Sequence, residues 1–233
     1  MEEHTVQEIA VLMAAGLGTR MRPITEKIPK PLVQVRGIPM IETVIEALRE
    51  RKVGDIYIVV GYLKEQFQYL QQKYGNIYLI ENKDYREVNN ISSIFAVADI
   101  IGEANCFICE ADLFISDSML LCRELKQSGY FGKMVQGYSA DWGFDMNKDG
   151  IYHIHKGVTD SYNMVGVSYF LKQDVKQIAD AVKNIYGTNG YEGLFWDEVV
   201  DMLLETMNLT IYPVDRGQII EIDTVEELEK MHG

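Results

Sequence analysis

The sequence is poor in cysteine, proline and positive charge, and each shortage excludes a class of protein. With 3 Cys and 5 Pro in 233 residues, it is neither a disulfide scaffold nor a collagen-like or disordered chain. No apolar run approaches the roughly 18 residues of a membrane span, and the opening Met-Glu-Glu-His-Thr lacks the basic start of a signal peptide. We therefore expect a packed cytoplasmic protein without membrane insertion.

Positive charge is scarce overall but concentrated in one place. The chain has 22 Lys and Arg against 35 Asp and Glu, a net charge of −13. Such a field repels a phosphate backbone and excludes nucleic acid as a partner. Within this acidic chain, eleven residues carry four cations: Arg20, Arg22, Lys27 and Lys30. That local cluster predicts a small polyanionic ligand.

The cysteines predict free thiols in a reducing compartment, because their number is odd and no export signal precedes them. Cys106 and Cys109 are spaced as in a redox motif, but they lie inside an apolar run that is typical of a strand. We expect both to be buried structural thiols.

Apolar strand-like runs alternate with helical periodicity in the first half of the chain, which predicts an α/β fold with a doubly wound, mostly parallel sheet. The expected strands are 8–13, 55–60, 77–80 and 105–109, and the expected helices are 40–51, 64–73 and 91–101. The rhythm then becomes β-rich, with strands at 133–140, 142–146, 151–155, 164–171 and 210–214, and with helices at 174–186, at 196–207 and after 223. We expect one domain, residues 1–233, whose nucleotide-binding half (about 1–130) and β-rich acceptor half (about 131–233) enclose a cleft.

A glycine-bearing loop follows the first strand, where α/β folds place ligands. Gly16 and Gly18 would let backbone N–H groups approach anionic oxygens. The loop has Met21 where a dinucleotide fingerprint needs a third glycine, and it lacks the Gly-Lys-Ser/Thr of a Walker A motif. Its three prolines stiffen it for wrapping a ligand. A solvated basic turn is the alternative.

The segment Leu12–Leu32 resembles the signature loop of nucleotidyltransferases (pyrophosphorylases), which join a nucleoside triphosphate to a phosphorylated small molecule. The likeness to bacterial CTP:phosphocholine cytidylyltransferases, members of the sugar-nucleotide pyrophosphorylase-like superfamily, extends over most of the chain. It is carried by the segments 59–67, 89–93, 110–114, 195–197 and 221–223. The resemblance implies a Rossmann-like nucleotidyltransferase fold. Many sugar-nucleotide pyrophosphorylases carry a C-terminal β-helix, and because this sequence ends at residue 233 without one, we expect no appended acyltransferase activity.

The resemblance also implies roles for residues that match the family's motifs. Arg20 would hold the β- and γ-phosphates and Lys30 the α-phosphate, which suits a multi-donor guanidinium and a mobile point charge. The nucleotide-binding residues implied by the loop are Leu12, Ala14, Ala15, Gly16, Gly18 and Thr19. Asn82 and Asn90 occupy the region that reads a pyrimidine, although Asn90 could equally cap the next helix.

A divalent ion, Mg²⁺, is the cofactor that the resemblance implies, and carboxylates suit it. The metal-binding positions of the family fall on Asp112 and Asp223, with Glu221 a weaker candidate on the same strand face. Asp112 could instead be a strand-end turn residue, and Asp223 a helix N-cap. Glu110 stands where related enzymes often have aspartate, so its role as a ligand stays open.

The acceptor pocket is expected in the second half, because aromatic faces with acidic support hold a trimethylammonium group by cation–π attraction. The candidates are Trp142, Tyr191, Glu192, Trp196 and Asp197, and Lys156 matches the lysine that related enzymes aim at the acceptor phosphate. We expect Phe195 to pack in the core, and a surface lysine is the alternative for Lys156.

The leading hypothesis is an enzyme that converts CTP and phosphocholine to CDP-choline and pyrophosphate by in-line attack on the α-phosphate. The alternatives keep this chemistry with 2-aminoethylphosphonate, phosphoethanolamine or a sugar 1-phosphate as the acceptor. A catalytically silent nucleotide-binding regulator is a hypothesis of another class, disfavoured because Arg20, Lys30, Asp112 and Asp223 are all present.

Overall fold

A nine-stranded mixed sheet organises residues 7–232, the part of the chain that the computed structural model describes. The N-terminal pentapeptide considered above lies outside this range. The parallel part of the sheet consists of β1 (Glu8–Ala14), β4 (Ile56–Val60), β5 (Ile77–Glu81) and β6 (Asn105–Glu110). β1 pairs in parallel with β4 and β6, and β4 pairs with β5, so the carboxyl ends of these strands lie along one edge.

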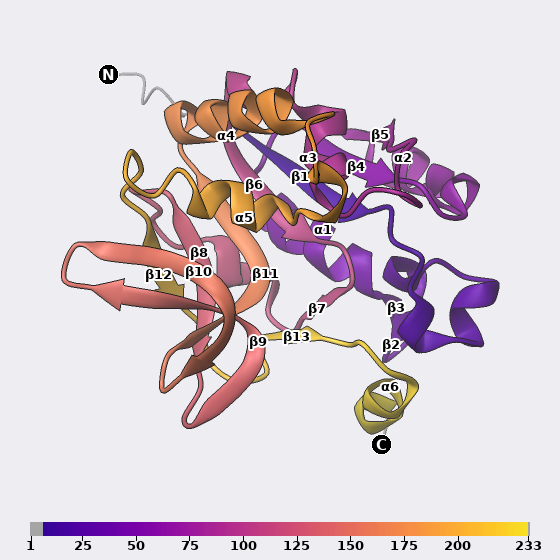
Figure 1. The fold of residues 1–233 in the computed structure, drawn as a ribbon. Coiled ribbons are helices and arrows are strands. Elements are labelled where there is room, and N and C mark those ends of the chain that lie inside the picture. Colours follow the sequence, from indigo (N-terminus) through magenta and orange to yellow (C-terminus); the bar gives the residue numbers. More distant parts are fainter. Residues whose placement is uncertain (1–6, 233) are drawn as a thin grey trace, which may run out of the picture.

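Helices cover both faces of this sheet, because its buried strands are apolar on both sides (Figure 1). Along β1, Leu12 belongs to the core cluster on one face and Val11 to the cluster on the other. The first cluster includes side chains of α1 (Met40–Glu50) and α2 (Gln68–Tyr74). The second includes side chains of α3 (Ile91–Val97), α4 (Lys172–Ile185) and α5 (Trp196–Asp201). This arrangement is a doubly wound sheet, as the sequence predicts.

The second half of the chain extends the same sheet with antiparallel strands. These are β8 (Gly129–Met134), β9 (Tyr138–Asn147), β10 (Gly150–Thr159) and β11 (Tyr162–Phe170), with β12 (Thr210–Pro213) parallel to β8. β11 pairs with β6, which joins the two halves edge to edge. The β9–β10 hairpin therefore projects beside the carboxyl ends of the parallel strands (Figure 1).

Two small sheets bring the C-terminal segment to the same edge. β13 (Ile219–Glu221) pairs with β7 (Leu113–Ile115), and β2 (Gln34–Val35) pairs with β3 (Ile38–Pro39). A third core cluster contains Phe114, Ile222 and Leu228, the last from α6 (Val225–His232). This packing places residues near 223 beside residues near 112.

The fold class is confirmed, and the main differences from the sequence prediction lie in the second half. The strands expected at 133–140 and 142–146 are instead β8 at 129–134 and one long β9 at 138–147. The sequence does not predict that β8 begins at Gly129, because glycine is a poor strand former. The structure shows why glycine is needed there: a Cβ at this position would lie 2.2 Å from the Thr210 carbonyl oxygen of β12. The helix expected to reach residue 207 ends at Asp201, whose carboxylate accepts a hydrogen bond from the Ile154 N–H of β10 (2.6 Å).

The thiol prediction is confirmed, since Cys106 and Cys109 are free and buried in β6, and Cys122 is free and exposed. Burial raises the pKa of the Cys106 thiol well above its usual value, which disfavours a reactive thiolate. Between residues 7 and 232, no helix combines the length and the apolar character that crossing a bilayer requires.

Candidate active site

The loop after β1 folds as a chain of short 3₁₀ turns at 19–21, 24–26 and 30–32. Gly18 adopts a left-handed conformation (φ 61°), and a Cβ at this position would lie 3.0 Å from the Lys30 Cβ. The Thr25 hydroxyl donates a hydrogen bond to the Gly18 carbonyl oxygen (2.7 Å). Glycine is therefore needed where the loop folds back on itself, and this turn directs Lys30 into the cleft.

Lys30 lies at the centre of the site. Its Nζ contacts Asp112 Oδ2 at 2.5 Å and Asp223 Oδ1 at 2.6 Å, and its side chain is 9% exposed. Arg20 Nη1 donates to the other oxygen of Asp223 at 2.7 Å. Three segments that are distant in the sequence, the glycine loop, the end of β6 and the segment after β13, thus meet here.

The charged groups of this cluster shift one another's pKa values. Burial disfavours the charged form of Asp223, but hydrogen bonds and charge from Lys30, together with Arg20, outweigh it and lower the pKa. Burial likewise opposes the Lys30 ammonium, yet Asp112 and Asp223 raise its pKa. For Glu221 the charge of Lys30 compensates only in part: removal from water and the charges of Asp112 and Asp223 outweigh it and raise the pKa of Glu221 to about 7.

Asp112, Glu221 and Asp223 each offer a carboxylate oxygen, and these oxygens lie within 4.8 Å of one another. Oxygen ligands of this kind, completed by substrate phosphates and water, are what Mg²⁺ prefers. The donor set therefore fits a divalent cation. Glu110 is not in this group.

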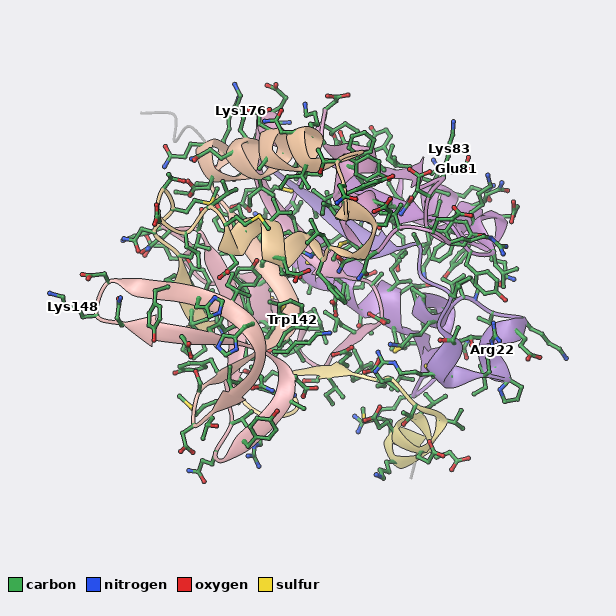
Figure 2. All side chains as sticks on the ribbon, in the orientation of Figure 1. Arg22, Glu81, Lys83, Trp142, Lys148 and Lys176 are labelled. Atoms are coloured by element: carbon green, nitrogen blue, oxygen red, sulfur yellow. The ribbon has the colours of Figure 1, made fainter. Side chains whose placement is uncertain are left out.

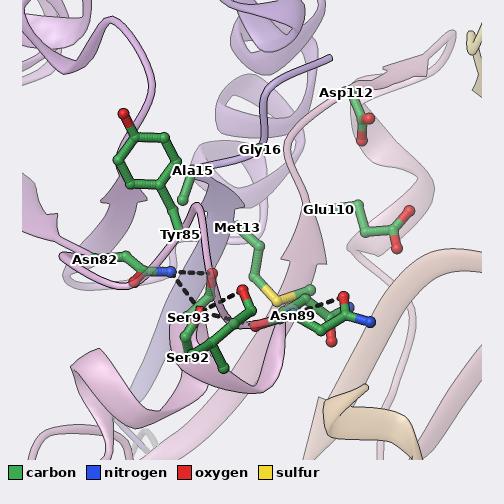
Figure 3. Close-up of a pocket in the computed structure, with 12 residues that line it drawn as sticks. Met13, Ala15, Gly16, Asn82, Tyr85, Asn89, Ser92, Ser93, Glu110 and Asp112 are labelled. Carbon is green, nitrogen blue, oxygen red and sulfur yellow. Dashed lines mark hydrogen bonds between the residues drawn. The ribbon is translucent and has the colours of Figure 1, made fainter. Parts of the chain in front are cut away.

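A cavity of about 280 Å³ lies between the glycine loop and the segment that precedes α3 (Figure 3). It is lined by Met13, Ala15, Gly16, Asn82, Tyr85, Val88, Asn89, Asn90, Ser92, Ser93, Glu110 and Asp112. Asn82 is buried, and its Nδ2 donates to the hydroxyl oxygens of Ser92 (2.8 Å) and Ser93 (3.2 Å). Because both N–H donors of this amide are used, Asn82 braces the cavity wall against α3.

A second cavity of about 260 Å³ adjoins the first at the glycine loop. Its lining is Met13, Ala14, Gly16, Gly18, Thr19, Arg20, Lys30, Pro31, Asp112 and Asp223. Of the expected nucleotide residues, only Leu12 lines neither cavity, because it is fully buried in the core of the sheet.

The third cavity, of about 410 Å³, lies between the first two and the β9–β11 strands. It is lined by Arg20, Asn90, Glu110, Lys133, Ala140, Asp141, Trp142, Lys156, Met164, Gly166, Phe195, Asp197, Glu221 and Asp223. Trp142 lies where the two halves of the molecule face each other (Figure 2). Because this cavity shares Glu110 with the first and Arg20 with the second, a ligand in it would lie beside a ligand bound in the other two.

Trp142 and Phe195 form an edge-to-face pair with ring centroids 5.3 Å apart. Lys156, the strand partner of Trp142, places its Nζ 5.2 Å from the Trp142 ring and 4.5 Å from the Phe195 ring. The ammonium forms no ion pair with any described residue. The protein's own cation therefore occupies the aromatic faces of this cavity.

Of the other expected acceptor residues, Asp197 lines this cavity, whereas Tyr191, Glu192 and Trp196 do not. Trp196 is 3% exposed and packs against Tyr130 and Phe170. Tyr191 packs against Tyr186, and Glu192 is exposed. The core position expected for Phe195 is instead taken by its neighbour Trp196, while Phe195 reaches the cavity. A sequence gives no signal for which of two adjacent aromatic residues faces inward.

Two carboxyl groups line the third cavity, those of Glu110 and Asp197. Asp197 is 3% exposed and accepts a hydrogen bond from the Tyr130 hydroxyl (3.1 Å), and burial raises its pKa to about 7. Glu110 has no hydrogen bond or ion pair with the described residues, and burial followed by the charge of Asp112 raises its pKa. Figure 3 shows the Glu110 and Asp112 side chains emerging together from the end of β6.

Hydrogen bonds connect the walls of the first and third cavities. The Trp196 N–H, at the start of α5, donates to Asn90 Oδ1 at 2.9 Å. Asn89 donates through its backbone N–H to the Glu192 carbonyl oxygen (2.8 Å) and through Nδ2 to that of Gly193 (3.2 Å). Asn90 therefore both lines the first cavity and holds the start of α5 in place.

The family of the chain is decided by comparison with known proteins. A model of the MobA-like NTP transferase domain matches residues 10–135, more than half of the chain. The chain belongs to this family. It is accordingly a nucleotidyltransferase, and the matched region contains the glycine loop, Lys30 and Asp112.

Similar full-length proteins narrow the family further. A 2-aminoethylphosphonate cytidylyltransferase of Lancefieldella rimae is 50% identical over 96% of this chain and 92% of its own length. A choline-phosphate cytidylyltransferase of Streptococcus pneumoniae is 34% identical over 95% of this chain and 96% of its own. Both are cytidylyltransferases.

Solved structures agree on the fold. The structure of CTP:phosphocholine cytidylyltransferase from Streptococcus pneumoniae superimposes with a TM-score of 0.86 at 33% identity, covering 97% of this chain and 98% of that one. A thymidylyltransferase structure from Bacillus anthracis covers 96% of this chain and 93% of its own with a TM-score of 0.79, and at 17% identity it shows only the shared fold.

Proposed function

We propose that this protein is a cytidylyltransferase that joins CTP to 2-aminoethylphosphonate, with release of pyrophosphate. The observation that carries the proposal is the 50% identity to a 2-aminoethylphosphonate cytidylyltransferase over nearly the whole chain. We assign the third cavity, hereafter the acceptor cavity, to this substrate. Its residues suit a small zwitterion, because they include cations for the phosphonate end and carboxyl groups for the ammonium end.

The cations of the acceptor cavity suit the phosphonate end. Lys133, Lys156 and Arg20 line it, and Lys133 and Lys156 form no ion pair with the described residues. The carboxyl groups of Glu110 and Asp197 suit the ammonium end, because neither forms an ion pair with a described lysine or arginine. A sugar 1-phosphate would leave these two acids without a partner.

The aromatic pair weighs against a quaternary ammonium. A trimethylammonium group is held mainly by aromatic faces, but the Lys156 ammonium already lies over Trp142 and Phe195. Phosphocholine remains the second candidate, favoured by the 34% identical choline-phosphate cytidylyltransferase. The proposed acceptor thus replaces the phosphocholine that the sequence motifs favour.

In the proposed reaction a phosphonate oxygen attacks the α-phosphorus of CTP. A new P–O bond forms there, the bond to the α–β bridging oxygen breaks, and its electron pair leaves with pyrophosphate. No protein base is needed, because the attacking oxygen is already ionised at neutral pH. Arg20 would bind the leaving phosphates, and Lys30 would turn from its two aspartates to the α-phosphate, stabilising the charge that develops there.

We also propose that Asp112, Asp223 and Glu221 hold Mg²⁺. When bound, the ion would neutralise phosphate charge and polarise the α-phosphate. The residues of the chain itself supply the rest: the glycine loop orients the triphosphate, and the acceptor cavity places the attacking oxygen beside it.

The test is pyrophosphate release with Mg²⁺, in a matrix of CTP, UTP, dTTP and ATP against four acceptors. These are 2-aminoethylphosphonate, phosphoethanolamine, phosphocholine and glucose 1-phosphate. We expect the pair of CTP and 2-aminoethylphosphonate to have the highest kcat/KM. A higher kcat/KM for phosphocholine would overturn the proposed acceptor but would still support cytidylyl transfer as the reaction. Nucleotide binding without turnover in any combination would instead favour a silent regulator.

A further inference from the structure

The acceptor cavity ends in a narrow recess, whose size and shape the proposed function leaves unexplained. The recess has a volume of about 10 Å³ and is lined by Met13, Ile108, Glu110, Tyr130, Met164, Gly166, Val167, Ser168, Trp196 and Asp197. Its walls are mostly apolar, yet two carboxylates face it. A recess of this size holds one group as large as a water molecule, for which about 10–15 Å³ is the minimum.

The recess exists because of a glycine in β11. Gly166 has a φ of 74°, and a Cβ at this position would lie 2.8 Å from Glu110 Oε2. Any other residue would displace the Glu110 carboxylate and also strain the backbone. The glycine thus leaves room for the Glu110 carboxyl group at the wall of an apolar recess, where it has no hydrogen-bond partner among the described residues. A buried polar group without a partner is a costly arrangement unless a ligand binds it.

We propose that this recess, between Glu110 and Asp197, is the ammonium subsite of the acceptor cavity and selects a primary amine by its size. The inference rests on the proposed function, which supplies an acceptor with an ammonium group. An –NH₃⁺ group is about as large as water and can donate to both carboxylates. A trimethylammonium group is several times larger and has no N–H to donate.

The hydrogen bonds around the recess distinguish the roles of three acidic residues, Asp197, Glu110 and Asp112. Asp197 is held by the Tyr130 hydroxyl at 3.1 Å, so its position is fixed before the ligand arrives. Glu110 has no hydrogen-bond partner among the described residues and is free to complete the pair. Asp112, two residues along, is engaged by Lys30 and belongs to the carboxylate cluster of the metal site. In this proposal Glu110 therefore binds the ammonium group, whereas Asp112 binds the metal ion.

The experiment compares 2-aminoethylphosphonate with propylphosphonate, in which a methyl group replaces the ammonium, and with the N-methyl and N,N,N-trimethyl derivatives. The variants are Glu110→Gln and Asp197→Asn, with Glu205→Gln and Asp180→Asn as charge-matched controls on exposed surface. We expect each cavity variant to lower the ratio of kcat/KM for 2-aminoethylphosphonate over propylphosphonate about 100-fold, and the controls to leave it unchanged. Wild-type kcat/KM should fall with each added methyl group.

Equal losses on both acceptors would mean that the carboxylates are only structural, and the proposal would be overturned. Calorimetric titration of the same ligands, with Mg²⁺ and a methylene-bridged CTP analogue, separates this inference from the proposed function. If binding depends on the amine but no transfer occurs, the subsite stands and the proposed reaction is wrong. If propylphosphonate binds as tightly as 2-aminoethylphosphonate, the subsite is wrong whatever the reaction.

Discussion

Replacing Lys30 by methionine should reduce both turnover and stability, because one ammonium serves two purposes. In the structure its Nζ lies between Asp112 Oδ2 at 2.5 Å and Asp223 Oδ1 at 2.6 Å, with Glu221 close to both carboxylates. Methionine keeps the length and the apolar stem of the side chain. The substitution therefore removes the charge with little change in packing.

The size of the stability effect follows from the exposure of the three groups. Charges about 4 Å apart at an effective dielectric constant near 20 attract by about 4 kcal/mol. The Lys30 side chain is 9% exposed and those of Asp112 and Asp223 are 23% and 21%, so desolvation and partial screening oppose this attraction. We expect Lys30→Met to lose about 2 kcal/mol of unfolding free energy at pH 8.

The loss should depend on pH in a definite direction. The pKa of Asp223 is lowered from its ordinary 3.8, mainly by Lys30 against the effect of burial, so the stability it contributes is present above about pH 4 and is lost as the pH falls further. The difference between wild type and Lys30→Met should accordingly be full at pH 8 and shrink below pH 4.

The assays are chemical denaturation across this pH range and pyrophosphate release at neutral pH, with Lys148→Met in the exposed β9–β10 turn as the matched control. We expect turnover of Lys30→Met to fall about 1000-fold, as for the loss of a group that stabilises transition-state charge. A variant that keeps more than a tenth of wild-type turnover would refute the assigned role. Unchanged unfolding free energy would refute the ion-pair argument.

Three further substitutions test other parts of the site. Burial raises the pKa of Asp197 to about 7, so its contribution to stability is present below pH 4 and is lost as the pH rises through 7. The unfolding free energy of wild type should therefore fall by on the order of 3 kcal/mol between pH 4 and 8, and Asp197→Asn should abolish this fall in chemical denaturation. Asn90→Ala removes the acceptor for the Trp196 N–H and should raise KM for the acceptor substrate about fivefold, with Asn90→Asp restoring it in steady-state kinetics. Lys156→Ala frees the Trp142 face and should raise the kcat/KM of phosphocholine relative to 2-aminoethylphosphonate; an unchanged ratio would contradict the assigned place of this lysine.

Features that follow from local chemistry were predictable from the sequence. The apolar runs and helical spacings give the parallel sheet, and sheet topology alone brings the glycine loop at the end of β1 next to Asp112 at the end of β6. The cations of the loop needed no long-range information, since they are close together in the chain.

Features that depend on packing were not predictable in this way. The side chains of Phe195 and Trp196 are both aromatic, and only the seating of α5 on β10 decides that the second is buried. Asn82 lines the first cavity, but the sequence does not show that its amide nitrogen donates to the hydroxyl groups of Ser92 and Ser93. Likewise, β8 could not be recognised at Gly129, because the close approach of β12 arises from the tertiary structure.

The strand β6 has a consequence for how such enzymes can change during evolution. It is paired on one side with β1 and on the other with β11, so its register cannot slip without disrupting both neighbours. The places of positions 110 and 112 relative to the rest of the cleft are therefore fixed, whichever side chains they carry. New acceptor preferences would arise by substitution at position 110 or opposite it, on β9, β11 and α5, while the nucleotide half of the cleft stays as it is.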